Sequence, residues 1–149
     1  MLITIPVEII ALDDNSYHLF IEGFINGQHC DFIIDTGASK SVFALNYVSD
    51  ILDEVPVAQP ELQSAGIDAA ALDSHLGLIR NFKLGQLELN NMMVVLIDLT
   101  PIDQLYKSFC GKSIWGLIGS DFLVRYKARL DYGRKTLGLH IPKSSFIAG

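Results

Sequence analysis

Apolar and polar residues alternate at the start of the chain, which is the pattern of a strand that buries one face. Its apolar positions are Ile3, Ile5, Val7 and Ile9. Because Pro6 has no backbone N–H to donate, we expect this strand to lie at a sheet edge. The same alternation predicts strands at residues 17–25 and 28–34. Asn26-Gly27 between them is typical of a tight β-hairpin turn.

After the third strand, the spacing of apolar residues changes to that of a helix. Apolar residues recur at helical intervals between positions 44 and 52, so we expect a short helix there, with Ser41 helping to start it. We expect a second helix at residues 101–109, because Pro101 stands at its start and proline is favoured at the first position of a helix. Residues 64–71 fit either the tip of a hairpin or a weak, alanine-rich helix.

The second half of the chain is otherwise rich in strand patterns. The expected strands are residues 76–84, 87–97, 128–132 and 136–141. Residues 92–97 are continuously apolar, which predicts a segment buried on both faces. Met92 and Met93 would then fill gaps in the core. These patterns together predict an all-β fold with one or two short helices.

Composition narrows the class of protein. A chain of 149 residues, half of them hydrophobic and 19 % charged, is long enough for one domain with a sizeable core. The formal net charge of −6 argues against a nucleic-acid partner, because phosphate binding needs a basic surface. No apolar run reaches the length of a membrane span. The apolar start has no basic leader, so we expect a cytoplasmic protein that does not bind membranes.

The cysteines and histidines show no metal-binding spacing. Cys30 and Cys110 lie far apart, and we expect two buried free thiols, with a disulfide as the alternative. The four histidines are His18, His29, His75 and His140. None lies three to five residues from another histidine or cysteine ligand, so the sequence predicts no metal and no cofactor.

A carboxylate stands at the end of a buried strand. Phe32, Ile33 and Ile34 run directly into Asp35, and Thr36-Gly37-Ala38-Ser39 follows. A carboxylate in such a place is costly unless it is hydrogen-bonded or paired, so the site calls for a chemical reason. The stretch resembles the active-site loop of aspartic proteases, Asp-Thr-Gly followed by Ala or Ser. It is most similar to the single-copy version of the retropepsin-like (single-domain, retroviral-type) family.

A second motif strengthens the resemblance. Residues 116–123, Gly-Leu-Ile-Gly-Ser-Asp-Phe-Leu, resemble the family's signature of two apolar residues, Gly, any residue, Asp or Asn, any residue and Leu. In the family a strand passes under the active-site loop there and enters a short helix. Leu117 and Ile118 would pack under the loop, and Gly119 would permit close backbone approach. Ser120 or Asp121 would cap the helix and tie down neighbouring amides.

The resemblance implies a fold and a mechanism. It implies a closed or partly open β-barrel of the acid-protease type, formed as one domain over residues 1–149. The family's chemistry needs two carboxylates, and this chain has one Asp-Thr-Gly, so two copies of Asp35 would meet in a homodimer. The substrate would be a peptide or protein. Of the neighbours, Thr36 would hold the two loops together, and Gly37 would let an amide approach the carboxylates.

The remaining roles also come from the resemblance. Ala38 and Ser39 would line the base of the site. The family's flap, a hairpin that closes over substrate, would have its tip near Ala65, Gly66 and Ile67, where this chain is poorer in glycine than is usual. Two other readings stay open: a catalytically inactive binding or dimerisation module of the same fold, and a small β-barrel that binds an apolar ligand.

Overall fold

The structure is a computed structural model that describes residues 1–13, 15–58 and 74–147. The strands are β1 (Leu2–Pro6), β2 (Glu8–Asp13), β3 (Ser16–Ile25), β4 (Gln28–Ile34), β5 (Val42–Ala44), β6 (Val57–Ala58), β7 (His75–Leu84), β8 (Leu87–Ile97), β9 (Ile114–Ile118), β10 (Arg129–Asp131) and β11 (Thr136–His140). The α-helices are α1 (Leu45–Val48), α2 (Thr100–Cys110) and α3 (Ser120–Arg125), with 3-10 helices at Ser49–Ile51 and Lys143–Ser145. No helix in the described ranges is long and apolar enough to cross a membrane.

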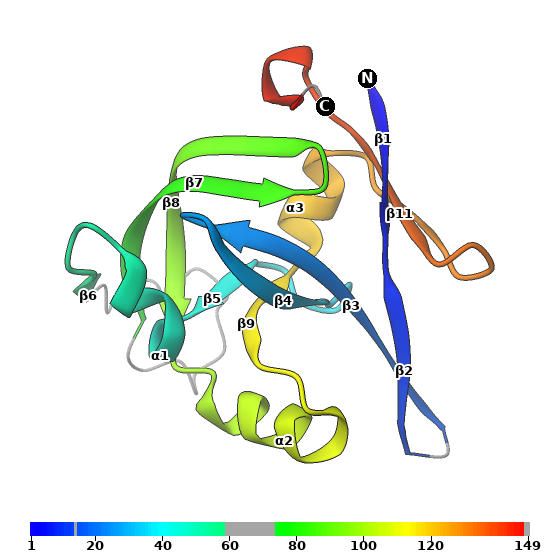
Figure 1. Ribbon diagram of the computed structural model, residues 1–149, viewed down its shortest axis with the longest axis horizontal. Coiled ribbons are helices and arrows are strands. Elements are labelled where there is room, and N and C mark those ends of the chain that lie inside the picture. Colours follow the sequence, from blue (N-terminus) through cyan, green and yellow to red (C-terminus); the bar gives the residue numbers. More distant parts are fainter. Residues whose placement is uncertain (14, 59–73, 148–149) are drawn as a thin grey trace.

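Six strands close on themselves around the core, in the order β3-β4-β9-β5-β8-β7 (Figure 1). The ring closes where β7 returns to β3, with Phe24 opposite Lys83 and Ile25 opposite Phe82. The predicted Asn26-Gly27 turn starts the β3–β4 hairpin, and both residues have positive φ, 48° and 83°, as a tight turn of this type requires. The expected fold class, mostly β with a closed barrel and a few short helices, is confirmed.

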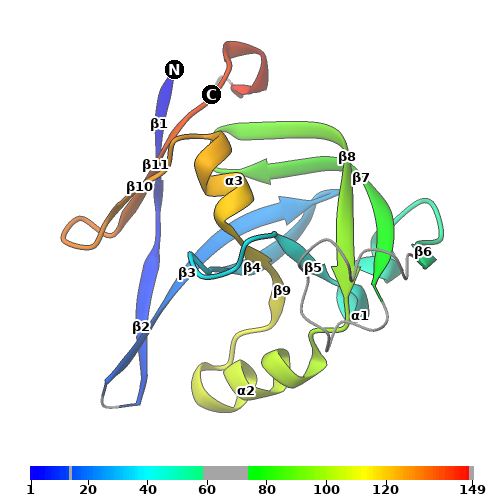
Figure 2. The same cartoon turned by 180° about the vertical axis from the view of Figure 1, so that it is seen from behind.

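A second, three-stranded sheet has the order β1-β11-β10 and lies beside the barrel, next to both chain ends (Figure 2). The expected first strand divides at Val7, because β1 pairs with β11 whereas β2 pairs with β3. The Val7 amide donates to the carbonyl of Lys135 at 2.9 Å. β1, which ends at Pro6, is an edge strand of its sheet, as expected.

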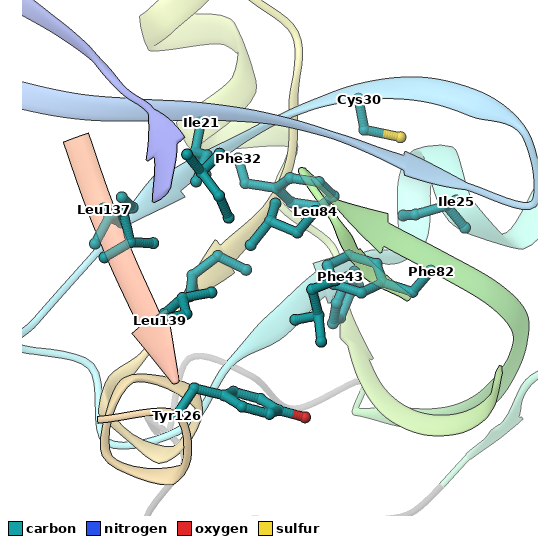
Figure 3. Close-up of a cluster of buried hydrophobic side chains, with 14 of the residues drawn as sticks. Ile21, Ile25, Cys30, Phe32, Phe43, Phe82, Leu84, Tyr126, Leu137 and Leu139 are labelled. Carbon is teal, nitrogen blue, oxygen red and sulfur yellow. The ribbon is translucent and has the colours of Figure 1, made fainter. Parts of the chain in front are cut away.

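Aromatic rings fill the middle of the barrel. Phe32 of β4, Phe43 of β5 and Phe82 of β7 meet edge to face in all three pairings, with ring centroids 5.8–5.9 Å apart (Figure 3). All three side chains are buried. Burying each such side chain stabilises the fold by roughly 1.5–3 kcal/mol. This packing gives β4, the strand that ends before Asp35, a rigid base.

Two local predictions are wrong. Residues 92–97 are not buried on both faces throughout: Met93 is 60 % exposed, and of the two methionines only Met92 packs against the core. On the same face as Met93, Val95 and Ile97 are partly buried against a second apolar cluster. Residues 92–95 line a cavity of about 440 Å³ together with residues of α3. Ser41 does not start the helix, because β5 intervenes and α1 begins at Leu45.

Both cysteines are free thiols, as expected. Cys30 is buried, and burial raises the pKa of its thiol to about 12. Cys110 is only partly buried, at the end of α2, so the expectation of two buried thiols holds for Cys30 alone.

Candidate active site

Asp35 lies at the point where β4 leaves the core. β4 runs parallel to β9, with Ile33 opposite Leu117 and Ile34 opposite Ile118. The Asp35 amide continues this pairing and donates to the carbonyl of Ile118 at 2.9 Å. Ile33 and Ile34 are buried, but Asp35 is only partly so. The two strands therefore hold the Asp35 backbone firmly while its carboxylate reaches the surface.

The loop after Asp35 folds back on the carboxylate. The Gly37 amide donates to Asp35 Oδ1 at 3.1 Å, and the Ala38 amide donates to the Asp35 carbonyl at 3.1 Å. A side chain at Gly37 would place its Cβ 3.4 Å from Asp35 Oδ1, at the close end of ordinary contact. The loop thus directs a backbone donor at one carboxylate oxygen, and the other oxygen is left for further partners.

The junction of β9 and α3 clamps this loop from below. The Ser120 amide donates to the Ala38 carbonyl at 2.7 Å, and the Gly119 amide donates to Ser41 Oγ at 2.8 Å. A Cβ on Gly119 would lie 2.8 Å from both the Ala38 oxygen and the Lys40 carbonyl carbon. Only glycine fits this backbone contact without displacing the loop.

Asp121 ties the far end of the loop to α3. Its Oδ1 accepts the Ser41 amide at 2.9 Å, the Ser41 hydroxyl at 2.7 Å and the Phe122 amide at 2.8 Å. This is the contact that Ser41 makes in place of the expected helix start. One carboxylate oxygen therefore joins the second motif to the segment that follows the first.

The remaining expected site residues lie around this loop or outside the described residues. Thr36 and Ser39 are exposed beside Asp35. Ala65, Gly66 and Ile67, the expected flap tip, lie outside the described residues. On either side of that segment, β6 and β7 pair antiparallel, with Val57 opposite Leu76 and Ala58 opposite His75.

The sequence patterns missed a cavity next to Asp35. It has a volume of about 310 Å³, and its lining includes Asp35, Thr36, His18 of β3 and Tyr106 of α2. These positions are far apart in the chain, and neither a scattered histidine nor a helical tyrosine carries a motif. The pairing of β3 with β4 and the packing of α2 against both strands bring them together.

The sequence patterns also missed a group of three potential metal-ligating side chains on the β3–β4 hairpin. The ligand atoms of Glu22, His29 and Asp31 lie within 4.8 Å of one another, because cross-strand pairing joins positions that spacing along the chain does not. Asp31 Oδ1 is buried and has no hydrogen-bond partner among the described residues. Burial raises the pKa of the Asp31 carboxyl, and the positive charge of Lys112 partly offsets this rise. Glu22 and His29 are exposed, and Glu22 Oε1 lies 3.6 Å from His29 Nε2.

Comparison with known proteins agrees with this geometry. A family model described as aspartyl protease matches residues 21–122, a span that runs from β3 to α3 and includes the first motif and all but the last residue of the second. The chain therefore belongs to the aspartyl protease family. No curated protein sequence matches it.

Two solved structures are similar in architecture. One is a retropepsin-like aspartic protease from Rickettsia conorii, with 19 % identity and a TM-score of 0.47, over 93 % of this chain and 90 % of that one. The other is the retroviral protease-like domain of Ddi1 from Leishmania major, with 14 % identity and a TM-score of 0.49, over 87 % of this chain and 98 % of that one.

Proposed function

We propose that this chain is an aspartic endopeptidase that works as a homodimer, in which the two Asp35 carboxylates share one active site. The observation that carries the proposal is the placement of Asp35: a partly exposed carboxylate at the end of a buried strand, with the Gly37 amide 3.1 Å from Oδ1. Membership of the aspartyl protease family supports it. We further propose that residues 1–149 form one domain of this kind.

The chemistry requires two carboxylates that hold one proton between them. Like charges at such short range cannot both ionise, so one group stays protonated while the other is a carboxylate. The carboxylate takes a proton from a water molecule, whose oxygen attacks the carbonyl carbon of the peptide bond. The protonated partner donates a hydrogen bond to the carbonyl oxygen. The first carboxyl group then transfers the proton it took from water to the amide nitrogen, the carbon–nitrogen bond breaks, and the pair again holds one proton.

The single Asp-Thr-Gly in the sequence is the reason for two chains. In a symmetric dimer the same residue supplies both halves of the pair. We propose that the terminal strands contribute to the interface. β1 is an edge strand in the part of the chain that the structure describes, and Leu2 on it is 56 % exposed. An unpaired edge of this kind favours pairing with another chain.

The test is the substitution Asp35→Asn, which keeps the size of the side chain and removes the ionisable group. We predict loss of all cleavage of a denatured protein mixture, with the dimer and the melting temperature preserved. Wild-type cleavage should stop when an inhibitor with a hydroxyl group that mimics the tetrahedral intermediate is added. Mass spectrometry of the peptide products measures both effects.

The matched control is Asp131→Asn. Asp131 Oδ1 accepts the Arg134 amide at 2.9 Å in the β10–β11 turn, and an asparagine oxygen can accept the same bond. Activity of this variant should stay within a few-fold of the wild type. Cleavage by purified Asp35→Asn at the wild-type rate would refute the assignment. A wild-type protein that binds the inhibitor but cuts nothing would instead indicate an inactive binding module.

A further inference from the structure

The cavity beside Asp35 has one polar wall built from two elements. His18 lies on β3 and Tyr106 on α2, and both line the same cavity of about 310 Å³ as Asp35 and Thr36. A peptide bond held at Asp35 would therefore place a neighbouring side chain within reach of this wall. This volume is at the lower end of the range for ligand pockets, and it is large enough for one side chain.

A chain of hydrogen bonds fixes the Tyr106 hydroxyl at the wall. The hydroxyl lies 2.7 Å from His18 Nδ1, and His18 Nε2 lies 2.6 Å from Ser16 Oγ. The Tyr106 ring also meets the rings of His18 and Phe20 edge to face, each with centroids 5.4 Å apart. With only 7 % of Tyr106 exposed, its orientation is set by packing as well as by hydrogen bonding.

The Tyr106 hydroxyl keeps capacity for one more partner. A neutral imidazole has one N–H donor and one acceptor nitrogen, and its tautomer decides which faces Tyr106. If Nδ1 accepts, the hydroxyl hydrogen is used and its oxygen can accept from a ligand. If Nδ1 donates, the hydroxyl hydrogen is free to donate to a ligand. Burial, followed by the charge of Asp35, raises the pKa of Tyr106, which keeps the hydroxyl protonated.

We propose that this cavity is a subsite for one substrate side chain beside the cleaved bond, and that Tyr106, positioned by His18, selects an amide side chain such as glutamine over an apolar one. This inference rests on the proposed peptidase function. A primary amide carries both a donor and an acceptor, so it matches the hydroxyl in either tautomer of His18. A carboxylate would meet the negative charge of Asp35 in the same cavity, whereas an apolar chain would leave the remaining donor or acceptor of the hydroxyl unpaired.

The experiment compares two peptides that differ at one position. A peptide cut by the wild-type protein is synthesised with glutamine or with norleucine at each position flanking the cleaved bond in turn. At one of these positions, kcat/KM should be roughly tenfold higher for the glutamine peptide, the size of effect that a buried hydrogen bond gives. In Tyr106→Phe, the ratio of kcat/KM for the glutamine peptide to that for the norleucine peptide should fall to within about twofold of one. His18→Gln should reduce it as well, because the hydroxyl loses its fixed partner.

Tyr126→Phe is the control, because Tyr126 is a buried tyrosine that lines the other cavity, at α3. Its ratio should equal that of the wild type. A wild-type protein with no preference at any position, or a preference that survives Tyr106→Phe, overturns the inference and leaves the peptidase function intact.

If the wild-type protein cuts no peptide, the proposed function fails, and the subsite is tested by binding alone. Fluorescence anisotropy of labelled peptide pairs that differ only by glutamine or norleucine at one position should then show the glutamine preference in Kd, and Tyr106→Phe should remove it. Equal binding of each pair, or no binding of either peptide, overturns the inference in this case.

Discussion

Gly119 determines how closely the Asp35 loop lies against the junction of β9 and α3. The atoms nearest to its missing side chain, the Ala38 oxygen and the Lys40 carbonyl carbon, both belong to the backbone. Backbone atoms cannot turn aside as the end of a long side chain can. The glycine in the second motif is therefore explained by space, and the loop that carries Asp35 depends on it.

We predict that Gly119→Ala lowers the free energy of unfolding by about 1–3 kcal/mol, the usual cost of an added methyl group in a tightly packed place. Because the loop must move to make room, peptidase activity should fall further than stability alone explains. Denaturant unfolding and a peptide assay measure the two effects. Gly133→Ala is the control, since the nearest atom to its Cβ would be 3.5 Å away. Equal stability of both variants would show that the close approach is unimportant.

At the scale of elements, the local pattern of residues predicted strands and helices correctly where that pattern alone determines the element. The strands on both sides of Asn26-Gly27 and the Pro101 helix lie where the sequence predicted them. The local pattern failed where pairing with a segment far along the chain determines the structure. The first strand changes sheets at Val7 because its first half pairs with β11 and its second half pairs with β3. Ser41 bonds Asp121, 80 positions away, and no local signal indicates that pairing.

Asp103 is another long-range contact of this kind. It is 4 % exposed on α2, where its Oδ1 accepts the Ile114 amide of β9 at 2.8 Å and its Oδ2 accepts the hydroxyl of Tyr47. Lys107 Nζ lies 3.3 Å from Oδ2 at the surface. This carboxylate therefore joins α2 to α1 and to the start of β9, and it holds in place the helix that carries Tyr106.

We predict that Asp103→Ala lowers the free energy of unfolding by about 2–4 kcal/mol, because the buried Ile114 amide and the Tyr47 hydroxyl lose their acceptor. Asp103→Asn keeps an oxygen for the Ile114 amide and should cost less than half as much. Urea unfolding with a reductant present measures both. Lys107→Ala, which removes a half-exposed ammonium from Asp103 and from the face of the Tyr47 ring, should change the midpoint less than Asp103→Ala does. A loss with Lys107→Ala as large as that with Asp103→Ala would place the stabilisation in the ion pair instead.

At the scale of the whole molecule, the sequence predicted the class of fold but not the neighbours of Asp35. The two motifs and the alternation of the strands indicated a barrel around that residue. Barrel closure depends on pairing between β3 and β7, whose paired residues are 57 and 59 positions apart and carry no mutual signal. The cavity that joins His18, Asp35 and Tyr106 lies where α2 packs against β3 and β4, so it was visible only once the chain was folded.

The last prediction separates a shared active site from one that is complete in each chain. Wild-type and Asp35→Asn chains are refolded together in varied ratios at constant total concentration. If each site needs two Asp35 carboxylates, only dimers of two wild-type chains are active, and activity follows the square of the wild-type fraction. An equal mixture should then retain about a quarter of the wild-type activity, because chains pair at random in a symmetric dimer. The same mixture made with Asp131→Asn should lose almost nothing. An activity that falls in proportion to the wild-type fraction would mean that a single chain carries a working site, and the homodimer mechanism would be wrong.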